Sequence, residues 1–181
     1  MVLSEAAERQ QQFSVHYGAA ELPRLAALVN EAAKDAAGGD VVAPDMCAVL
    51  SFSQHEAPSF VAVSVQIEGT YTLPCQRCLE LVAVKVNIDQ RLAVADGLDD
   101  TTLEALEADF EQWDHEGDTL ALAELVDELL MLDLPLVVAH ATLEDCGPLA
   151  KQLAGDDEAA VSQRPFAGLQ ALMAGNDKQD N

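Results

Sequence analysis

Two cysteines separated by two residues, Cys75 and Cys78, are the side chains of this sequence best suited to chemistry. Two intervening residues let both sulfur atoms converge at a tight turn, which suits either a metal ion or a redox pair. A structural zinc site needs four ligands, and His140 with Cys146 would complete the set. The sequence therefore offers a candidate zinc site of three thiolates and one imidazole.

Two other interpretations of these cysteines stay open. In one, all four cysteines are reduced and structural, and Cys47 packs on a strand as a small hydrophobe. Leu79 favours this interpretation, because a metal-binding turn that needs positive φ suits a small residue there. In the other, Cys75 and Cys78 form a thiol-redox pair, although such pairs usually lie at a helix N-terminus, which lowers a thiol pKa. We therefore expect no required cofactor, with zinc as the alternative.

The motifs of common enzyme classes do not accompany these cysteines. The sequence has no Gly-rich phosphate loop, no G-x-S-x-G, no H-E-x-x-H and no calcium loop. Adjacent carboxylates such as Asp99 and Asp100 arise by chance in so acidic a chain. The sequence therefore predicts a protein without catalytic residues.

Alternating apolar residues place the two cysteines at the tip of a β-hairpin. The apolar positions are odd-numbered from Val61 to Leu73 and even-numbered from Val82 to Ile88. Alternation of this kind is typical of half-buried strands. We therefore expect two antiparallel strands joined by a turn over Pro74–Cys78.

Three shorter patterns predict further strands, and one glycine predicts an irregularity. Side chains expected on opposite faces of a strand alternate along Phe13–Tyr17 and along Cys47–Phe52. A short apolar run covers Leu136–His140. Gly69, inside the first strand of the hairpin, is expected to mark a bulge.

Two segments have apolar residues at helical spacing. The first extends from Leu22 to Lys34 and has Pro23 in its first turn. The second contains Leu122–Leu130, is expected to be capped by Asp118 or Thr119, and should end before Pro135.

Together these elements predict one α+β domain over residues 1–150, in which helices pack against an antiparallel sheet. The patterns leave open whether that sheet closes into a barrel. An acidic loop containing one short helix is expected over Asp96–Asp118. The polar residues 151–181 predict a mobile tail. A short apolar motif in this tail is expected to dock on the protein's own domain or on a partner; it contains Phe166, Leu169 and Leu172.

The net charge limits the classes of partner. Thirty-two acidic and nine basic residues give a formal charge of −23, which repels phosphate and disfavours non-specific nucleic-acid binding. Half of the carboxylates, 16, lie between Leu92 and Ala150, where there is no Lys or Arg. Basic partners are therefore expected, unless the charge serves only solubility.

Three of the nine basic residues, Arg77, Lys85 and Arg91, belong to the hairpin. Their concentration on one element predicts a local contact with RNA or with a partner.

The sequence has neither a secretory signal at its start nor a run of about 18 apolar residues. We therefore expect a cytoplasmic protein without membrane contacts.

Several motifs in a fixed order resemble those of the bacterial YceD family, the 23S ribosomal RNA accumulation proteins. They are Leu73–Cys78, Leu129–Pro135, His140 with Cys146, and Pro165–Leu172. The resemblance implies a role in the synthesis, processing or stability of the large ribosomal RNA. It implies no defined catalytic activity.

Our first hypothesis is a non-catalytic factor of large-subunit biogenesis that contacts basic ribosomal proteins, rRNA or rRNA-processing enzymes. Its expected contact surfaces are the acidic segment Asp96–Asp118 and the hairpin cations. The alternative is a zinc-binding or thiol-redox protein that uses Cys75 and Cys78. A third hypothesis is a structural domain that self-assembles through an open sheet edge beside Ala48–Phe52.

Overall fold

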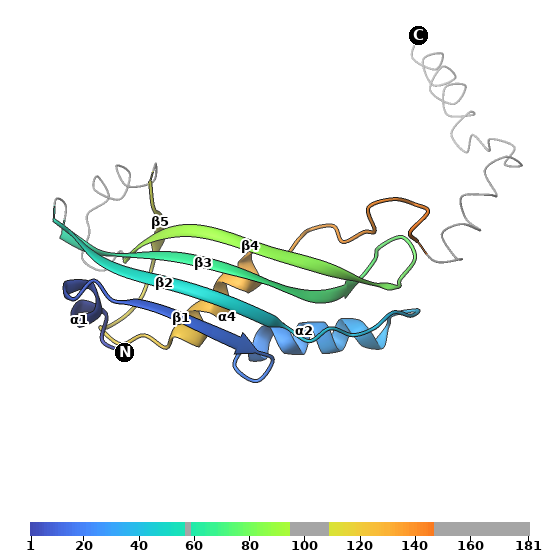
Figure 1. Cartoon of the computed structure of the whole chain (residues 1–181), viewed down its shortest axis with the longest axis horizontal. Helices are drawn as coiled ribbons and strands as arrows, with labels where there is room; N and C mark the ends of the chain where they lie inside the picture. The colour runs from blue at the N-terminus through green and yellow to red at the C-terminus, as the bar shows by residue number, and fades with distance from the viewer. Residues whose placement is uncertain (57–58, 95–108, 147–181) are drawn as a thin grey trace, which may run out of the picture.

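The protein has a mixed α+β fold, as the sequence predicts (Figure 1). The computed structural model describes residues 1–56, 59–94 and 109–146. Most of the expected helix of the acidic loop, which contains Leu103, Leu106 and Phe110, lies outside these ranges, and Phe110 itself is not helical. The tail 151–181 with Phe166 and Leu169 also lies outside them. The described elements are α1 (Leu3–Glu8), β1 (Gln12–Gly18), α2 (Pro23–Lys34), β2 (Asp45–Glu56), β3 (Ser59–Pro74), β4 (Leu81–Val94), β5 (Glu111–Trp113) and α4 (Leu122–Leu132).

The strands form one sheet in the order β1-β2-β3-β4-β5. Strands β1 to β4 are antiparallel to their neighbours, and the short β5 is parallel to β4. The sheet ends at β1 and β5, so the described strands do not close into a barrel. Ala48–Phe52 belongs to β2, which lies between two strands, so the expected open edge at this segment is wrong. The acidic segment also includes a strand, β5, which was expected to be loop.

The register between β3 and β4 explains the alternation in the sequence. Leu73 pairs with Val82 and Ile67 with Ile88, so the odd-numbered residues of β3 share a face with the even-numbered residues of β4. Gly69 pairs without interruption on both sides, so the expected bulge is absent. A Cβ at this position would lie 2.4 Å from Sδ of Met46. The glycine therefore permits a close approach of neighbouring strands.

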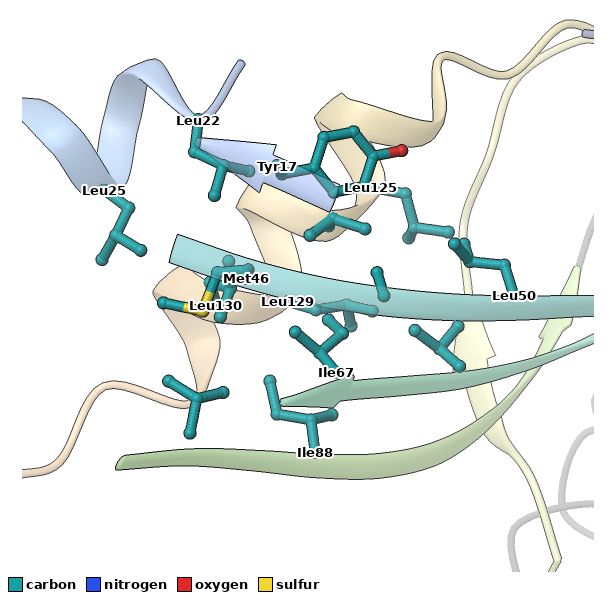
Figure 2. Packing of buried hydrophobic residues seen from close by; sticks show 14 of the residues in the cluster. Tyr17, Leu22, Leu25, Met46, Leu50, Ile67, Ile88, Leu125, Leu129 and Leu130 are labelled. Atoms are coloured by element: carbon teal, nitrogen blue, oxygen red, sulfur yellow. The ribbon is translucent and has the colours of Figure 1, made fainter. Parts of the chain in front are cut away.

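Helices α2 and α4 cover one face of the sheet, and the core lies between these two layers (Figures 1 and 2). Each fully buried Leu, Ile or Val stabilises such a core by roughly 1.5–3 kcal/mol relative to exposure. The opposite face of the sheet is mainly polar. Buried core residues seen in Figure 2 are Leu22 and Leu25 of α2, Met46 and Leu50 of β2, Ile67, Ile88, and Leu125, Leu129 and Leu130 of α4.

The helix ends differ from the sequence prediction. Helix α4 has Ala121 at its N-cap and no side-chain capping bond, so the expected cap by Asp118 or Thr119 is wrong. Asp118 instead accepts hydrogen bonds from Ser4 of α1, at 2.8 Å from the backbone N–H and 2.5 Å from the hydroxyl.

The expected strand over Leu136–His140 is wrong, because this segment has no regular secondary structure. None of the described helices is long and apolar enough to cross a membrane.

Candidate metal centre

The turn between β3 and β4 holds two of the four predicted ligands. The backbone N–H of Leu79 donates to the carbonyl oxygen of Cys75 at 2.9 Å, and the N–H of Cys75 donates to that of Glu80 at 2.9 Å. Leu79 adopts φ of 63°, the left-handed conformation that a small residue reaches at lower cost. The leucine therefore does not prevent the positive φ of a metal-binding turn, contrary to its interpretation from the sequence.

The segment that follows α4 lies beside this turn (Figure 1). The backbone N–H of Gln76 donates to the carbonyl oxygen of Val138 at 2.8 Å, and its side-chain amide donates to that of Leu136 at 3.3 Å. The guanidinium of Arg77 donates to the carbonyl oxygen of His140. These carbonyl groups accept hydrogen bonds from the tip of the hairpin and not from a neighbouring strand. The segment after α4 is therefore irregular backbone that lies beside the turn.

A second turn directs Cys146 toward the hairpin. The hydroxyl of Thr142 donates to the carboxylate of Asp145 at 2.8 Å, and the backbone N–H of Cys146 donates to the carbonyl oxygen of Leu143 at 3.1 Å. These bonds close the chain over four residues. Cys146 thereby becomes buried, with only 2% of its surface exposed.

The structure brings together all four residues that the sequence offers as zinc ligands. One donor atom from each of Cys75, Cys78, His140 and Cys146 lies within 4.8 Å of the others. Nδ1 of His140 is 3.5 Å from Sγ of Cys78 and 3.8 Å from Sγ of Cys146. The three cysteines are buried and the histidine is half-buried. The hairpin and the loop after α4 thus supply two donor groups each.

The thiols of this cluster differ in acidity. Burial acts to raise the pKa of Cys75, but the N–H of Arg77, 3.4 Å from its sulfur, together with hydrogen bonds from His140 and Cys78, lowers that pKa to about 5. Burial raises the pKa of Cys146 to about 11, and hydrogen bonds with the Cys78 and Cys75 side chains add to the increase. A cation among the sulfur atoms would favour the ionised form of every thiol.

The arrangement fits some kinds of chemistry better than others. Three thiolates and an imidazole are typical ligands of structural zinc, and four protein ligands leave no open position for a substrate. All four cysteines are free thiols. The pair Cys75 and Cys78 lies between strands and not at a helix N-terminus, where redox pairs usually lie. Cys47 is on β2 and lies outside the cluster.

The predicted partner-binding residues of the hairpin do not converge on one patch. Arg77 is in the turn and contacts the loop carbonyl of His140, whereas Arg91 lies with its guanidinium carbon 4.4 Å from the ring centre of Phe110. Lys85 is exposed on β4 between them. Two of these three cations therefore make contacts within the chain. Their role toward a partner stays a prediction, as does that of Phe166 and Leu169.

An exposed apolar segment beside the cluster was not predicted from the sequence. Leu132, Leu136 and Val137 are 76%, 95% and 69% exposed. They adjoin a groove of about 320 Å³ whose lining is Leu28, Ala32, Leu73, Pro74, Gln76, Leu134, Pro135 and Val138. The signal in the sequence was the apolar run after the helix, which was interpreted as a strand. We call residues 132–137 the apolar segment.

Fold and site together define an acidic α+β protein in which a Cys/His cluster joins a β-hairpin to a loop. The sequence model described as "Large ribosomal RNA subunit accumulation protein YceD" matches residues 63–173, more than half of the chain. The chain therefore belongs to the YceD family, as the resemblance predicted. The family is named for the accumulation of an RNA and not for a reaction. No curated protein and no solved structure matches the chain.

Proposed function

We propose that the protein is a non-catalytic factor that supports the synthesis, processing or stability of 23S rRNA in large-subunit biogenesis. Membership of the YceD family carries this proposal, because the family description names large-subunit rRNA accumulation. The partners consistent with that role are large-subunit ribosomal proteins, rRNA and rRNA-processing enzymes.

The charge of the chain supports contacts with basic partners. A formal charge of −23 attracts Lys- and Arg-rich proteins over long range and repels bare phosphate. Several described cations already make contacts within the chain: Arg9 and Lys34 pair with glutamates, and Arg77 and Arg91 make the contacts given above. Basic ribosomal proteins are therefore the partner class that the charge favours.

The apolar segment supplies a surface for such a partner. Exposed apolar clusters with polar surroundings are typical of protein interfaces. The carboxylate of Asp133, inside this segment, and that of Glu128, which precedes it on α4, are exposed, and the chain has no Lys or Arg between Leu92 and Ala150. An apolar surface in acidic surroundings suits one occupant best: a Lys- and Arg-rich segment of a large-subunit ribosomal protein that also carries apolar anchor residues.

A pull-down from cell extract at two salt concentrations tests this function. We expect large-subunit proteins to be recovered at low salt and to decrease at high salt, because charge attraction is screened. The double variant Leu136→Ser/Val137→Ser should bind roughly tenfold less, as expected when apolar anchors are lost. Val41→Ser, which alters a valine that is 52% exposed elsewhere in the chain, is the matched control. Absence of ribosomal components at low salt, or equal binding by both variants, would contradict the proposal.

A further inference from the structure

We propose that Cys75, Cys78, His140 and Cys146 bind one zinc ion, which cross-links the loop after α4 to the tip of the β3–β4 hairpin. The inference rests on the geometry of the four side chains and is independent of the proposed function. The description of the family mentions no metal.

The distances between donor atoms agree with tetrahedral zinc. With Zn–S bonds of about 2.3 Å and Zn–N bonds of about 2.0 Å, a sulfur and a nitrogen ligand lie about 3.5 Å apart and two sulfur ligands about 3.8 Å apart. Nδ1 of His140 lies 3.5 Å from Sγ of Cys78 and 3.8 Å from Sγ of Cys146. All four donor atoms fall within 4.8 Å of one another. The cluster therefore has the size of a zinc coordination shell.

A purely hydrophobic cysteine cluster explains this arrangement less well. Nδ1 of His140 approaches two sulfur atoms, but one ring nitrogen carries a single proton or a single lone pair. It can therefore satisfy only one of the two contacts as a hydrogen bond. A cation at the centre of the cluster would satisfy every donor atom at once.

The donor types select the metal. Oxygen ligands are required by Mg²⁺ and Ca²⁺, and the cluster contains no carboxylate. Thiolate with imidazole in tetrahedral geometry is typical of zinc. Because all four positions would be filled by protein, the ion would be structural.

The local backbone suits this role. Leu79, with φ of 63°, lets the turn fold back after Cys78, and the N–H of Arg77 points to Sγ of Cys75 at 3.4 Å. Such N–H groups stabilise a thiolate. The loop itself has no helix or strand from 134 to 146. Val138 packs in the main core, and Gln76 and Arg77 bind loop carbonyl groups, so a metal ion would add a cross-link at the His140–Cys146 end of the loop.

The first test is the zinc content of the 181-residue chain, prepared without a His-tag in reducing buffer from zinc-supplied cells. We expect about one zinc ion per chain in the wild type and in Cys47→Ser, and a small fraction of that in Cys75→Ser and Cys146→Ser. Cys47→Ser is the matched control because Cys47 lies outside the cluster. A wild type without zinc, or a Cys75→Ser variant with a full complement, would overturn the proposal.

Cobalt substitution keeps the proposal testable if the cysteine variants do not fold. The wild-type chain with Co²⁺ should show thiolate-to-metal charge transfer and the intense visible bands of tetrahedral cobalt. The weak spectrum of octahedral cobalt would overturn the proposal. A protein isolated from zinc-supplied cells without zinc, in which Cys75 and Cys78 form a disulfide reversibly, would overturn it in favour of the thiol-redox interpretation.

Hydrogen exchange tests the cross-link itself. After removal of zinc by a chelator, amides of residues 139–146 should exchange faster, while those in the middle of β2 and β3 should change little, because these strands pack in the main core and not in the cluster of Cys75, Cys78 and Cys146. Equal protection of the loop with and without zinc would show that the metal does not constrain it.

Discussion

The carboxylate of Asp127, on α4, accepts a hydrogen bond from the backbone N–H of Leu25, on α2, at 3.1 Å. Its second oxygen accepts from the N–H of Arg24 at 2.9 Å. Asp127 is only 2% exposed, and Leu22, at the N-cap of α2, makes no side-chain capping bond. The N-terminus of one helix is therefore capped by a side chain of the other, which fixes the two helices that cover the sheet.

Replacing this carboxylate should destabilise the fold. Asp127→Ala leaves the buried N–H of Leu25 and the partly buried N–H of Arg24 without their acceptor, and we expect the free energy of unfolding to fall by about 2 kcal/mol. Asp127→Asn keeps one acceptor oxygen and should lose less. Urea denaturation of both variants measures the difference. An Asp127→Ala protein as stable as the wild type would show that the interhelical cap contributes nothing.

Gly69 provides a second test of the packing. A Cβ there would lie 2.3 Å from the carbonyl oxygen of Asp45 and 2.4 Å from Sδ of Met46. Gly69→Ala should therefore push β2 and β3 apart and lower the free energy of unfolding by about 1–3 kcal/mol. At Gly38 the nearest atom to an added Cβ is 3.9 Å away, so Gly38→Ala is the control and should change little. Equal denaturation midpoints for the two variants would contradict this account.

The contact between Ser4 and Asp118 predicts a pH dependence of stability. Hydrogen bonds from the Ser4 side chain and backbone lower the pKa of Asp118 below its ordinary value of 3.8. A group whose pKa is lowered by folding stabilises the folded state above the unfolded pKa, and this contribution disappears as the pH falls through the folded pKa.

Ser4→Ala should therefore reduce the melting temperature at pH 7, and its difference from the wild type should shrink below about pH 3.8. The effect should be small, because the pair is exposed. Ser14→Ala, at an exposed serine of β1, serves as the control. A melting-temperature difference that is constant from pH 7 to pH 3 would contradict the assignment.

The hairpin could be predicted from sequence because its pattern has period two over a long stretch. The alternation over Val61–Leu73 and Val82–Ile88 predicted the two strands and the turn between them. The observed pairing of Ile67 with Ile88 places both alternating sets on one face of the sheet, in agreement with that prediction. Helix α1 was missed, although Leu3, Ala6 and Ala7 have helical spacing and are buried. A helix of six residues is marginal alone and depends on tertiary contacts, here those with residues 118–120.

The candidate site could be predicted only in part. Residue types and the C-x-x-C spacing identified Cys75, Cys78, His140 and Cys146 as candidate ligands. Whether the four side chains lie close together depends on the path of the chain after α4. That path is set by Gln76 and Arg77, which bind the carbonyl groups of Leu136, Val138 and His140. An apolar run such as 136–140 fits a strand or a surface segment equally well, and hydrogen bonding to the hairpin decided between them.

The most direct test of the proposed function is the ratio of 23S to 16S rRNA in cells that lack this protein. We predict that the ratio falls in its absence and is restored by the wild type and by Val41→Ser. The double variant Leu136→Ser/Val137→Ser should fail to restore it, because it lacks the exposed apolar side chains that we propose contact the partner. A 23S level that is unchanged without the protein, or full restoration by the double variant, would contradict the account.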